Sequence, residues 1–245
     1  EARGLDEARR LHSQPFIDFL SANLGSTYAR NGQAKRGIPL LESAMGSLKS
    51  DYLVCIRADQ LGEAYRQVGR LPDAAAQFDR AVAACDRDHA LASLAGALDD
   101  RSQLELQRAA LDTAWADVRR ALDLVEQSRA HLVAADAYKT GYISASQTRD
   151  TYDLAVTVLM RRKQYQQAME VAEQGRARAL LDLLASGETT GHVAGLDAAQ
   201  GGLASPRHAA ALDYAGMLAQ AARLHSTILA YWLTGSRLFI WVARP

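Results

Sequence analysis

The chain has 245 residues, with 28 basic and 28 acidic side chains and a formal net charge of zero. This balance gives no bulk electrostatic attraction to nucleic acid, whose binding proteins carry an excess of Lys and Arg. About half of the residues are apolar (49%), only five are proline, and Ala and Leu dominate. We therefore expect a mainly helical protein of one large or two small domains.

Targeting and redox features point to the cytoplasm. No stretch reaches the ~18 uninterrupted apolar residues of a membrane helix, and no signal peptide is visible. Cys55 and Cys85 are too few for a disulfide framework, and each lies at an apolar position of a helical period, so we expect two buried thiols in a reducing compartment. Because the chain starts at Glu1 and stops at Pro245 after an apolar run, we also expect it to be part of a longer polypeptide.

Two segments near the N-terminus share one spacing of small and apolar residues. In residues 59–85 the set is Leu61, Gly62, Tyr65, Gly69, Ala74, Phe78 and Ala81; in residues 22–47 it is Leu24, Gly25, Tyr28, Gly32, Gly37, Leu41 and Ala44. This spacing resembles the tetratricopeptide (TPR) repeat, a pair of antiparallel helices. Gly62 and Ala74 are small enough for two backbones to approach, and Phe78 fills the groove between them. The pattern predicts a right-handed α-solenoid.

Two further repeats are weaker. A third has Ala114 in its second helix but Arg101 and Ser102 where Leu-Gly is expected, and a fourth has Ala168 in its second helix. The small residues of successive repeats lie further apart than the 34 residues of a strict TPR. Extra residues must therefore lengthen helices or loops, most of all in 125–150.

The residue composition changes after Leu184. Residues 187–208 are rich in Gly, Ser and Thr and predict a flexible linker, and a helical period returns in 209–225. Residues 227–243 are β-branched and aromatic around Gly235 and Ser236, which predicts a β-hairpin. Both faces of this hairpin are apolar, so both should be covered. One nearby helix can cover one face; the other needs residues that follow, the repeats, or a second molecule.

The end of the chain resembles TPR–CHAT proteins, in which TPR-like repeats precede a caspase-like CHAT domain. The family's closing helix "E-x-x-R-A-R-x-L-L-D-L-L" is matched by Glu173, Arg176, Ala177, Arg178, Leu180, Leu181, Asp182, Leu183 and Leu184. Its opening strand–turn–strand is similar to Tyr231, Trp232, Gly235, Leu238, Phe239 and Trp241. The resemblance implies repeats in 1–186, a linker in 187–208 and the start of a CHAT domain in 209–245, within a bacterial cysteine peptidase.

We assign no catalytic residue to this chain, and we expect no metal or cofactor. The family's catalytic His and Cys would lie further along, since no Cys follows Cys85 and the histidines beyond the linker region are only His208 and His225. Cys85 and His89 are close in sequence, but Cys85 ends a second helix, so we interpret the pair as incidental.

Candidate interaction residues lie on the first helices and on the closing helix. A peptide on the concave face would meet Ser26, Arg30, Asp59, Glu63, Arg66 and Gln67, although a mixed polar face of this kind is equally well explained by solvation. Arg176 and Arg178 either contact a partner domain or acidic ligand, or solvate their helix and pair with Glu173 or Asp182.

Three functions compete at this point. The first is the recognition and regulatory region of a TPR–CHAT peptidase, which binds a protein or peptide and whose segment 227–243 pairs with the remaining CHAT domain or a second chain. The second is a stand-alone TPR adaptor. The third, an enzyme in its own right, lacks any residue constellation to support it.

Overall fold

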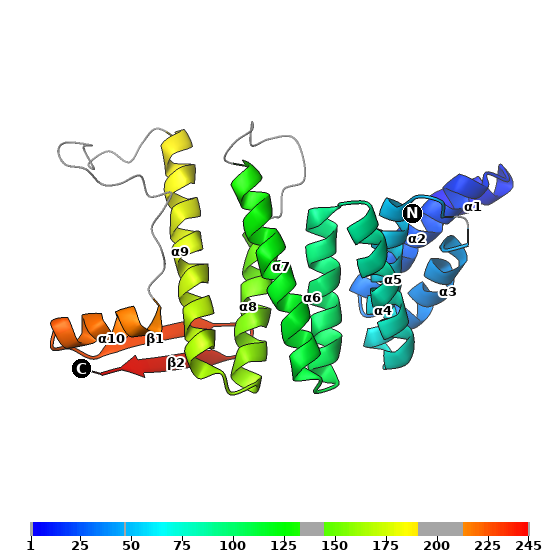
Figure 1. The fold of residues 1–245 in the computed structure, drawn as a ribbon. Coiled ribbons are helices and arrows are strands. Elements are labelled where there is room, and N and C mark those ends of the chain that lie inside the picture. Colours follow the sequence, from blue (N-terminus) through cyan, green and yellow to red (C-terminus); the bar gives the residue numbers. More distant parts are fainter. Residues whose placement is uncertain (1, 47, 133–144, 191–212, 245) are drawn as a thin grey trace. The chain divides into compact units, whose positions relative to one another are not determined.

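The structure is a computed structural model that describes residues 2–46, 48–132, 145–190 and 213–244. It divides into two compact units, residues 1–151 and 152–245, which we describe separately. The first unit contains α1 (Ala2–Arg10), α2 (Gln14–Arg30), α3 (Ala34–Ala44), α4 (Asp51–Gln67), α5 (Leu71–Arg87), α6 (Leu91–Gln107), α7 (Leu111–Leu132) and the start of α8 (Ala145–Arg161). The second contains the rest of α8, α9 (Tyr165–Thr190), α10 (Tyr214–Arg223), β1 (Ile228–Leu233) and β2 (Leu238–Ala243) (Figure 1).

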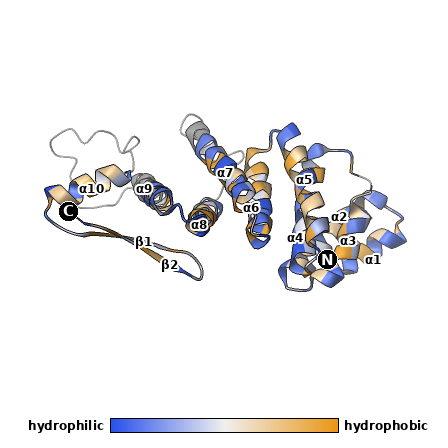
Figure 2. Cartoon of the chain, turned by 60° about the horizontal axis from the view of Figure 1, so that its bottom comes forward, coloured by the Kyte–Doolittle hydropathy of each residue, from blue (hydrophilic) through white to orange (hydrophobic). Residues whose placement is uncertain are grey.

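The first unit is a stack of antiparallel helix pairs. The pairs are α2 with α3, α4 with α5, and α6 with α7 (Figure 1), and the first helix α4 also contacts the first helices α2 and α6. This is the arrangement of TPR-like repeats, so the helical prediction from the sequence is confirmed. Hydrophobic and hydrophilic residues alternate around these helices (Figure 2), which lets each helix bury one stripe against its neighbours.

Small residues allow the predicted close approach within each pair. A Cβ atom on Gly37 would overlap the carbonyl oxygen of Gly25 across the α2–α3 crossing, and one on Gly62 would lie 2.8 Å from the ring of Phe78. Ala74 and Phe78 are fully buried. The small residues of the sequence pattern therefore mark the points where the two helices of a pair cross.

The third repeat replaces the Leu-Gly pair with polar contacts. Ser102 is fully buried and donates its hydroxyl to the carbonyl of Ala114 on α7, at 2.9 Å. Arg101 makes two hydrogen bonds to Asp117, at 2.7 and 2.8 Å, and one to Asp79, at 2.8 Å. Hydrogen bonds and two ion pairs thus hold α6 to α5 and α7 where the TPR pattern is degenerate.

Every three-residue loop that joins two helices in the described residues has the same backbone geometry. The middle residue has a left-handed φ: 50° at His12, 72° at Gly32, 79° at Gly69, 55° at His89, 61° at Ala109 and 61° at Lys163. The residue after it donates its N–H to a carbonyl five residues earlier, as Ala110 does to Glu105 at 2.9 Å. This is a Schellman-type helix end, in which glycine is favoured because it has no Cβ.

Ala109→Gly should therefore stabilise the protein. Relief of the left-handed strain exceeds the extra entropy of glycine in the unfolded chain, so we expect a gain of about 0.5–1 kcal/mol in chemical denaturation. The matched control is Ala116→Gly, an exposed site inside α7, which should lose about 1 kcal/mol. Equal effects of the two substitutions would contradict the loop geometry.

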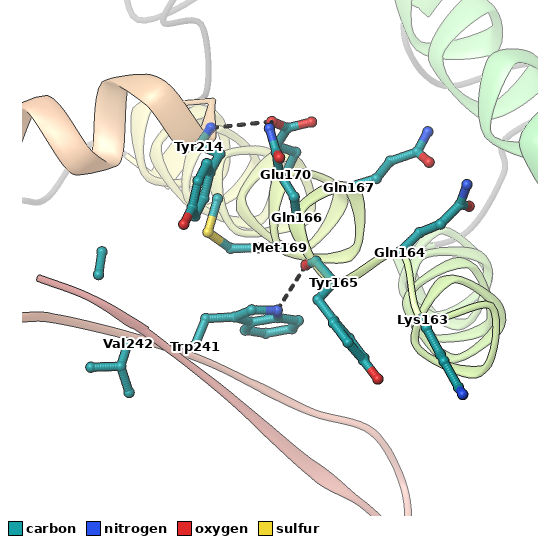
Figure 3. Close-up of a pocket in the computed structure, with 11 residues that line it drawn as sticks. Lys163, Gln164, Tyr165, Gln166, Gln167, Met169, Glu170, Tyr214, Trp241 and Val242 are labelled. Atoms are coloured by element: carbon teal, nitrogen blue, oxygen red, sulfur yellow. Dashed lines mark hydrogen bonds between the residues drawn. The ribbon is translucent and has the colours of Figure 1, made fainter.

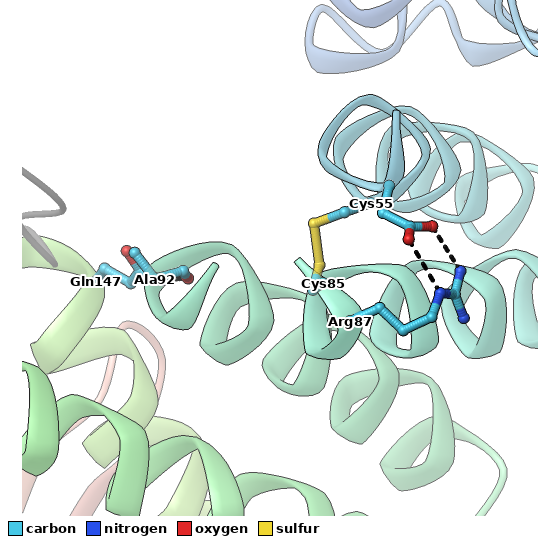
Figure 4. The surroundings of a disulfide bond; sticks show 6 residues. Cys55, Cys85, Arg87, Ala92 and Gln147 are labelled. Carbon is cyan, nitrogen blue, oxygen red and sulfur yellow. Dashed lines mark hydrogen bonds and ion pairs between the residues drawn. A yellow bond between two sulfur atoms is a disulfide. The ribbon is translucent and has the colours of Figure 1, made fainter. Parts of the chain in front are cut away.

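The two cysteines form a disulfide, so the expectation of two separate thiols is wrong. Cys55 of α4 and Cys85 of α5 are bonded through their Sγ atoms (Figure 4) and are completely buried in a core cluster. The apolar helical period of the sequence correctly predicted that both cysteines are buried. Only the packing of α4 on α5 brings their Cβ atoms together. Because disulfides persist mainly in oxidising surroundings, the prediction of a reducing compartment loses its basis. No helix among the described residues is long and apolar enough to cross a membrane.

The second unit contains the predicted hairpin and its helix. Strands β1 and β2 pair antiparallel, with Ile228 opposite Ala243 and Leu233 opposite Leu238. Helix α10 begins at Tyr214, where Asp213 caps it by accepting a hydrogen bond from Gly216 N–H at 2.7 Å. Helix α9 continues to Thr190, so residues 187–190 of the predicted linker are helical, and 191–208 lie outside the described residues. The division into 1–186, 187–208 and 209–245 stays a prediction.

Candidate interaction site

The predicted peptide-binding residues lie on two neighbouring first helices, α2 and α4. We call the surface formed by α2, α4, α6 and the start of α8 the first-helix face. Ser26 of α2 is 6% exposed, and its hydroxyl has no hydrogen-bond partner among the described residues; Arg30 is exposed. On α4, Glu63 accepts hydrogen bonds from Arg66, at 2.7 and 2.9 Å, and from Gln67, at 2.9 Å. Three of the six candidates therefore bond to one another.

The fourth residue on α4, Asp59, belongs to a carboxyl pair that the sequence did not reveal. Its side chain is hydrogen-bonded to Asp100 of α6, and its Oδ1 atom is buried without a partner among the described residues. Burial, with the nearby charges of Asp100 and Glu63, raises the pKa of Asp59 well above its usual range. Burial and Glu63 likewise raise the pKa of Asp100 to about 6, against the opposing effect of Arg66. Burial is thus the main cause that raises the pKa of both carboxyl groups of the pair.

Asp99, next to this pair on α6, is also held neutral. It is 8% exposed, and its Oδ2 accepts a hydrogen bond from the Thr151 hydroxyl at 2.5 Å. Burial is the main cause that raises the pKa of Asp99 to about 8; the Thr151 hydrogen bond opposes the shift, and the charges of Asp100 and Asp150 add to it. An aspartate in the unfolded chain titrates near pH 4, so the folded protein holds this proton more tightly.

Asp99→Asn should therefore make the protein more stable at high pH. The stabilisation from the Asp99 proton is complete below about pH 4 and is lost as pH rises through about 8. Asparagine stays neutral and still accepts the Thr151 hydrogen bond. Linkage between a pKa near 4 and one of about 8 is worth several kcal/mol at pH 9, so we expect a melting temperature there higher by on the order of 10 °C, with a much smaller difference at pH 5. The control Asp123→Asn, an exposed site on α7, should show no pH-dependent difference.

The aspartates of three successive repeats occupy one repeat position. Asp59, Asp99 and Asp153 each lie fifteen residues before the small residue of the second helix, which is Ala74, Ala114 or Ala168. Each bonds to a residue outside its own repeat. Asp59 bonds to Asp100 of α6, Asp99 to Thr151 of α8, and Asp153 accepts the indole N–H of Trp232 of β1 at 2.7 Å. In the second unit β1 thus makes the contact that the first helix of a further repeat would make.

The closing helix α9 holds this strand in place. The Arg176 guanidinium donates to the carbonyl of Tyr231 and also pairs with Glu173. The pairing with Glu173 that the sequence suggested for Arg176 is therefore present, and its contact with a partner domain or an acidic ligand stays a prediction. Gly175 leaves room for the indole of Trp232, since a Cβ atom there would lie 2.6 Å from the ring. The side chain of Arg178 lies outside the described part of the chain.

A groove of about 690 Å³ lies between the start of α9, the start of α10 and the end of β2 (Figure 3). The Trp241 indole N–H donates to the carbonyl of Tyr165 at 2.9 Å, and Glu170 accepts the backbone N–H of Tyr214 at 3.2 Å (Figure 3). Glu170 therefore joins α9 to α10, and Trp241 joins β2 to α9. The groove presents mostly amide and aromatic side chains, and we read it as part of the packing of the hairpin.

The hairpin has one covered face and one open face. Ala230 and Ala243 pack with Met169 of α9 and Met217 of α10. The other face, which we call the open hairpin face, consists of six apolar side chains that are each 51% to 64% exposed: Leu229, Tyr231, Leu233, Leu238, Ile240 and Val242. Cross-strand pairing places all six on the same side. The expected second cover is therefore not supplied by the described residues.

Comparisons with known proteins assign no function to this chain. No protein-family model matches the sequence, and no curated protein matches it. One similar solved structure is that of "nearly identical TPR-like repeats" of a putative kinesin light chain from Podosopora anserina, 17% identical, covering 69% of this chain and 94% of that chain with a TM-score of 0.38. Another is BtubC (BKLC) from P. vanneervenii, 14% identical, covering 83% of this chain and 95% of that chain with a TM-score of 0.44. At these values the fold assignment rests on the helix pairs themselves: residues 2–132 form TPR-like repeats.

Proposed function

We propose that this chain is the recognition and regulatory region of a TPR–CHAT caspase-like cysteine peptidase. Its repeats bind a protein or peptide on the first-helix face, and residues 209–245 begin the CHAT domain. A repeat stack is a scaffold for protein–protein interaction, because adjacent first helices present one extended surface. The rest of the proposal rests on the hairpin.

The single observation that carries the proposal is the contrast between the two faces of the hairpin. One face is fixed to α9 and α10, and the open hairpin face leaves on the order of 600 Å² of apolar surface in water, at roughly 200 Å² for a fully exposed large side chain. Exposed patches of this size mark interaction surfaces, and a two-stranded sheet is marginal unless more strands or helices join it. The remaining CHAT domain, or a second chain, covers this face.

The tie between repeats and hairpin gives the regulation a physical route. Trp232 reaches Asp153 on α8, and Arg176 and the carbonyl of Tyr165 on α9 bind the hairpin backbone and Trp241. The hairpin is thus joined to the last helix pair directly, and not only through the helix in 209–225 as the sequence predicts. A ligand that favours one arrangement of the repeats biases the peptidase half, provided that its affinity differs between the two arrangements.

The test uses Ile240→Ser on the open hairpin face, where Ile240 is 60% exposed. In the isolated chain this change should improve solubility without lowering stability. In the complete parent polypeptide it should abolish cysteine-dependent peptide hydrolysis, because the face is buried there. The residues that follow Pro245 in the parent provide the second readout: a strand ending in His-Gly and a later Cys are expected.

The alternative is a stand-alone TPR adaptor, favoured by the polar first-helix face alone. It requires a soluble, monomeric 1–245 whose hairpin amides exchange with solvent as fast as those of an unfolded peptide. That result, or a parent without a later His and Cys, would remove the CHAT assignment and leave the adaptor.

A further inference from the structure

The backbone of β2 directs half of its hydrogen-bonding groups away from β1. At the turn, the Thr234 N–H donates to the carbonyl of Arg237 at 2.9 Å, so these two residues form a hydrogen-bonded pair. Such pairs recur at every second position of an antiparallel ladder, and the residues between them point outward. The residues of β2 whose N–H and C=O groups point away from β1 are therefore Leu238, Ile240 and Val242.

The outer edges of the two strands differ in how they are covered. On β1, Tyr231 occupies one of the outward positions, and its carbonyl accepts the Arg176 guanidinium of α9. This contact agrees with the alternation set by the turn and closes the β1 edge. The outward groups of β2 have no hydrogen-bond partner among the described residues. An uncovered edge of this kind is a template for a further strand.

The groove of Figure 3 reaches the free edge of β2. Its lining includes Trp241 and Ala243, whose side chains lie on the covered face, and also Val242, whose side chain lies on the open hairpin face. The backbone edge is what Val242 presents to a groove on the covered side, so the groove opens onto the outward groups of β2. Tyr165 and Gln166 of α9 also line it. A strand added to β2 therefore has room for side chains beside Trp241.

The two sides of this edge differ in chemistry. In an added strand, residues opposite the outward positions of β2 lie beside the open hairpin face, and the alternate residues point into the groove. The amide of Gln166 in the groove both donates and accepts hydrogen bonds. Lys163 and Glu170, the charged residues of the lining, have opposite signs, so the groove favours neither charge. The edge thus fits a segment that alternates apolar residues with uncharged polar ones.

We propose that the outer edge of β2 binds an extended peptide of a partner protein as a third, antiparallel strand. Its apolar side chains extend the open hairpin face, and its amide side chains enter the groove. Antiparallel addition continues the pairing of β1 with β2 and is slightly more stable per residue than parallel addition. This strand addition is a recognised mode of peptide binding, in which the backbone gives affinity and alternate side chains give specificity.

The inference goes beyond the proposed function, in which the remaining CHAT domain covers the face of the hairpin and the repeats bind a ligand elsewhere. A second copy of this chain fits the edge less well. Antiparallel pairing of β2 with its own copy through a two-fold axis brings both copies of α9 and α10 to the groove side of the sheet.

The experiment compares two N-methylated forms of fluorescein-labelled (Val-Gln)4 for binding to the full 1–245 chain. In the antiparallel register the Val N–H groups face β2 and the Gln N–H groups face away. Methylation of the Gln nitrogens leaves the bonds to β2 intact and stops the peptide from pairing with itself, so this form should bind. Methylation of the Val nitrogens removes the donors to β2 and should weaken binding at least about ten-fold.

Variants of the chain test the same edge from the other side. Ile240→Pro removes one outward N–H but no bond to β1, a position where strands tolerate proline. It should weaken binding of the Gln-methylated peptide at least about ten-fold, whereas the control Ile240→Val keeps the N–H and should change it less than about two-fold. Gln166→Leu removes the amide from the groove and should weaken binding about three-fold.

Equal binding of the two methylated peptides, stronger binding of the Val-methylated form, or binding of neither would overturn the inference, and none of these readouts depends on the folding of a variant. Self-association of 1–245 that Ile240→Pro abolishes and Ile240→Val retains would assign the edge to a second copy and overturn it too. The CHAT assignment is judged separately by Ile240→Ser in the parent polypeptide, so the two failures are distinguishable.

Discussion

Reduction of the disulfide between Cys55 and Cys85 should lower the free energy of unfolding by about 3.5 kcal/mol. The two residues are 30 positions apart in sequence, and cross-linking a loop of that length removes chain entropy from the unfolded state by about this amount. For a chain of this size the loss corresponds to a melting temperature lower by roughly 10 °C. Thermal unfolding with and without dithiothreitol measures it.

The matched control is the double variant Cys55→Ala/Cys85→Ala. It should have the lower stability under both conditions and respond to the reductant by less than about 0.5 kcal/mol, the range of neutral changes. An unmodified chain whose stability is equal with and without reductant would mean that the two cysteines are thiols. In that case the cytoplasmic prediction would regain the support that the disulfide removes.

Trp232→Ala should detach the hairpin from the closing helices. Trp232 is held by the hydrogen bond to Asp153, by the space above Gly175 and by the guanidinium of Arg176, which lies 5.9 Å from its ring centre. Loss of a packed tryptophan costs about 3 kcal/mol. If this stability belongs to docking of the hairpin, amide exchange in β1 and β2 should accelerate about 100-fold, since 1.4 kcal/mol is a factor of ten.

Tyr231→Ala is the comparison for this experiment. Tyr231 adjoins Trp232 in β1 but points to the open hairpin face, where it is 64% exposed. Its removal should change exchange in β1 and β2 less than about three-fold, because only an exposed side chain is lost. If both substitutions accelerate exchange equally, the hairpin is not anchored through Trp232, and the proposed mechanical route from the repeats to the peptidase half fails with it.

The site was partly predictable. Asp59, Glu63, Arg66 and Gln67 lie on the first helix α4, as the TPR spacing predicts, and their role in binding stays a prediction. Asp99 and Asp100 were missed because the third repeat has Arg101 and Ser102 in place of the Leu-Gly pair that anchors the alignment. The signal was nevertheless in the sequence: Asp59, Asp99 and Asp153 stand at one distance from Ala74, Ala114 and Ala168. A search anchored on the second helices would have aligned them.

The sequence by itself determined the helix pairs, their turns and the hairpin. These depend on local periodicity: Gly37 and Gly62 mark crossings, Gly32 and Gly69 mark helix ends, and the β-branched run around Gly235 marks two strands. Each of these effects acts within one or two neighbouring elements, so the residue types record it directly.

Only the tertiary structure decided which distant side chains meet. Three contacts join residues that are 30 to 79 positions apart in sequence. They are the disulfide between Cys55 and Cys85, the carboxyl pair of Asp59 and Asp100, and the hydrogen bond from Trp232 to Asp153. No periodicity encodes such contacts, because they depend on the angle and offset at which whole helices pack. For the same reason the sequence showed two apolar faces on the hairpin, and only the packing of α9 and α10 decided which face stays open.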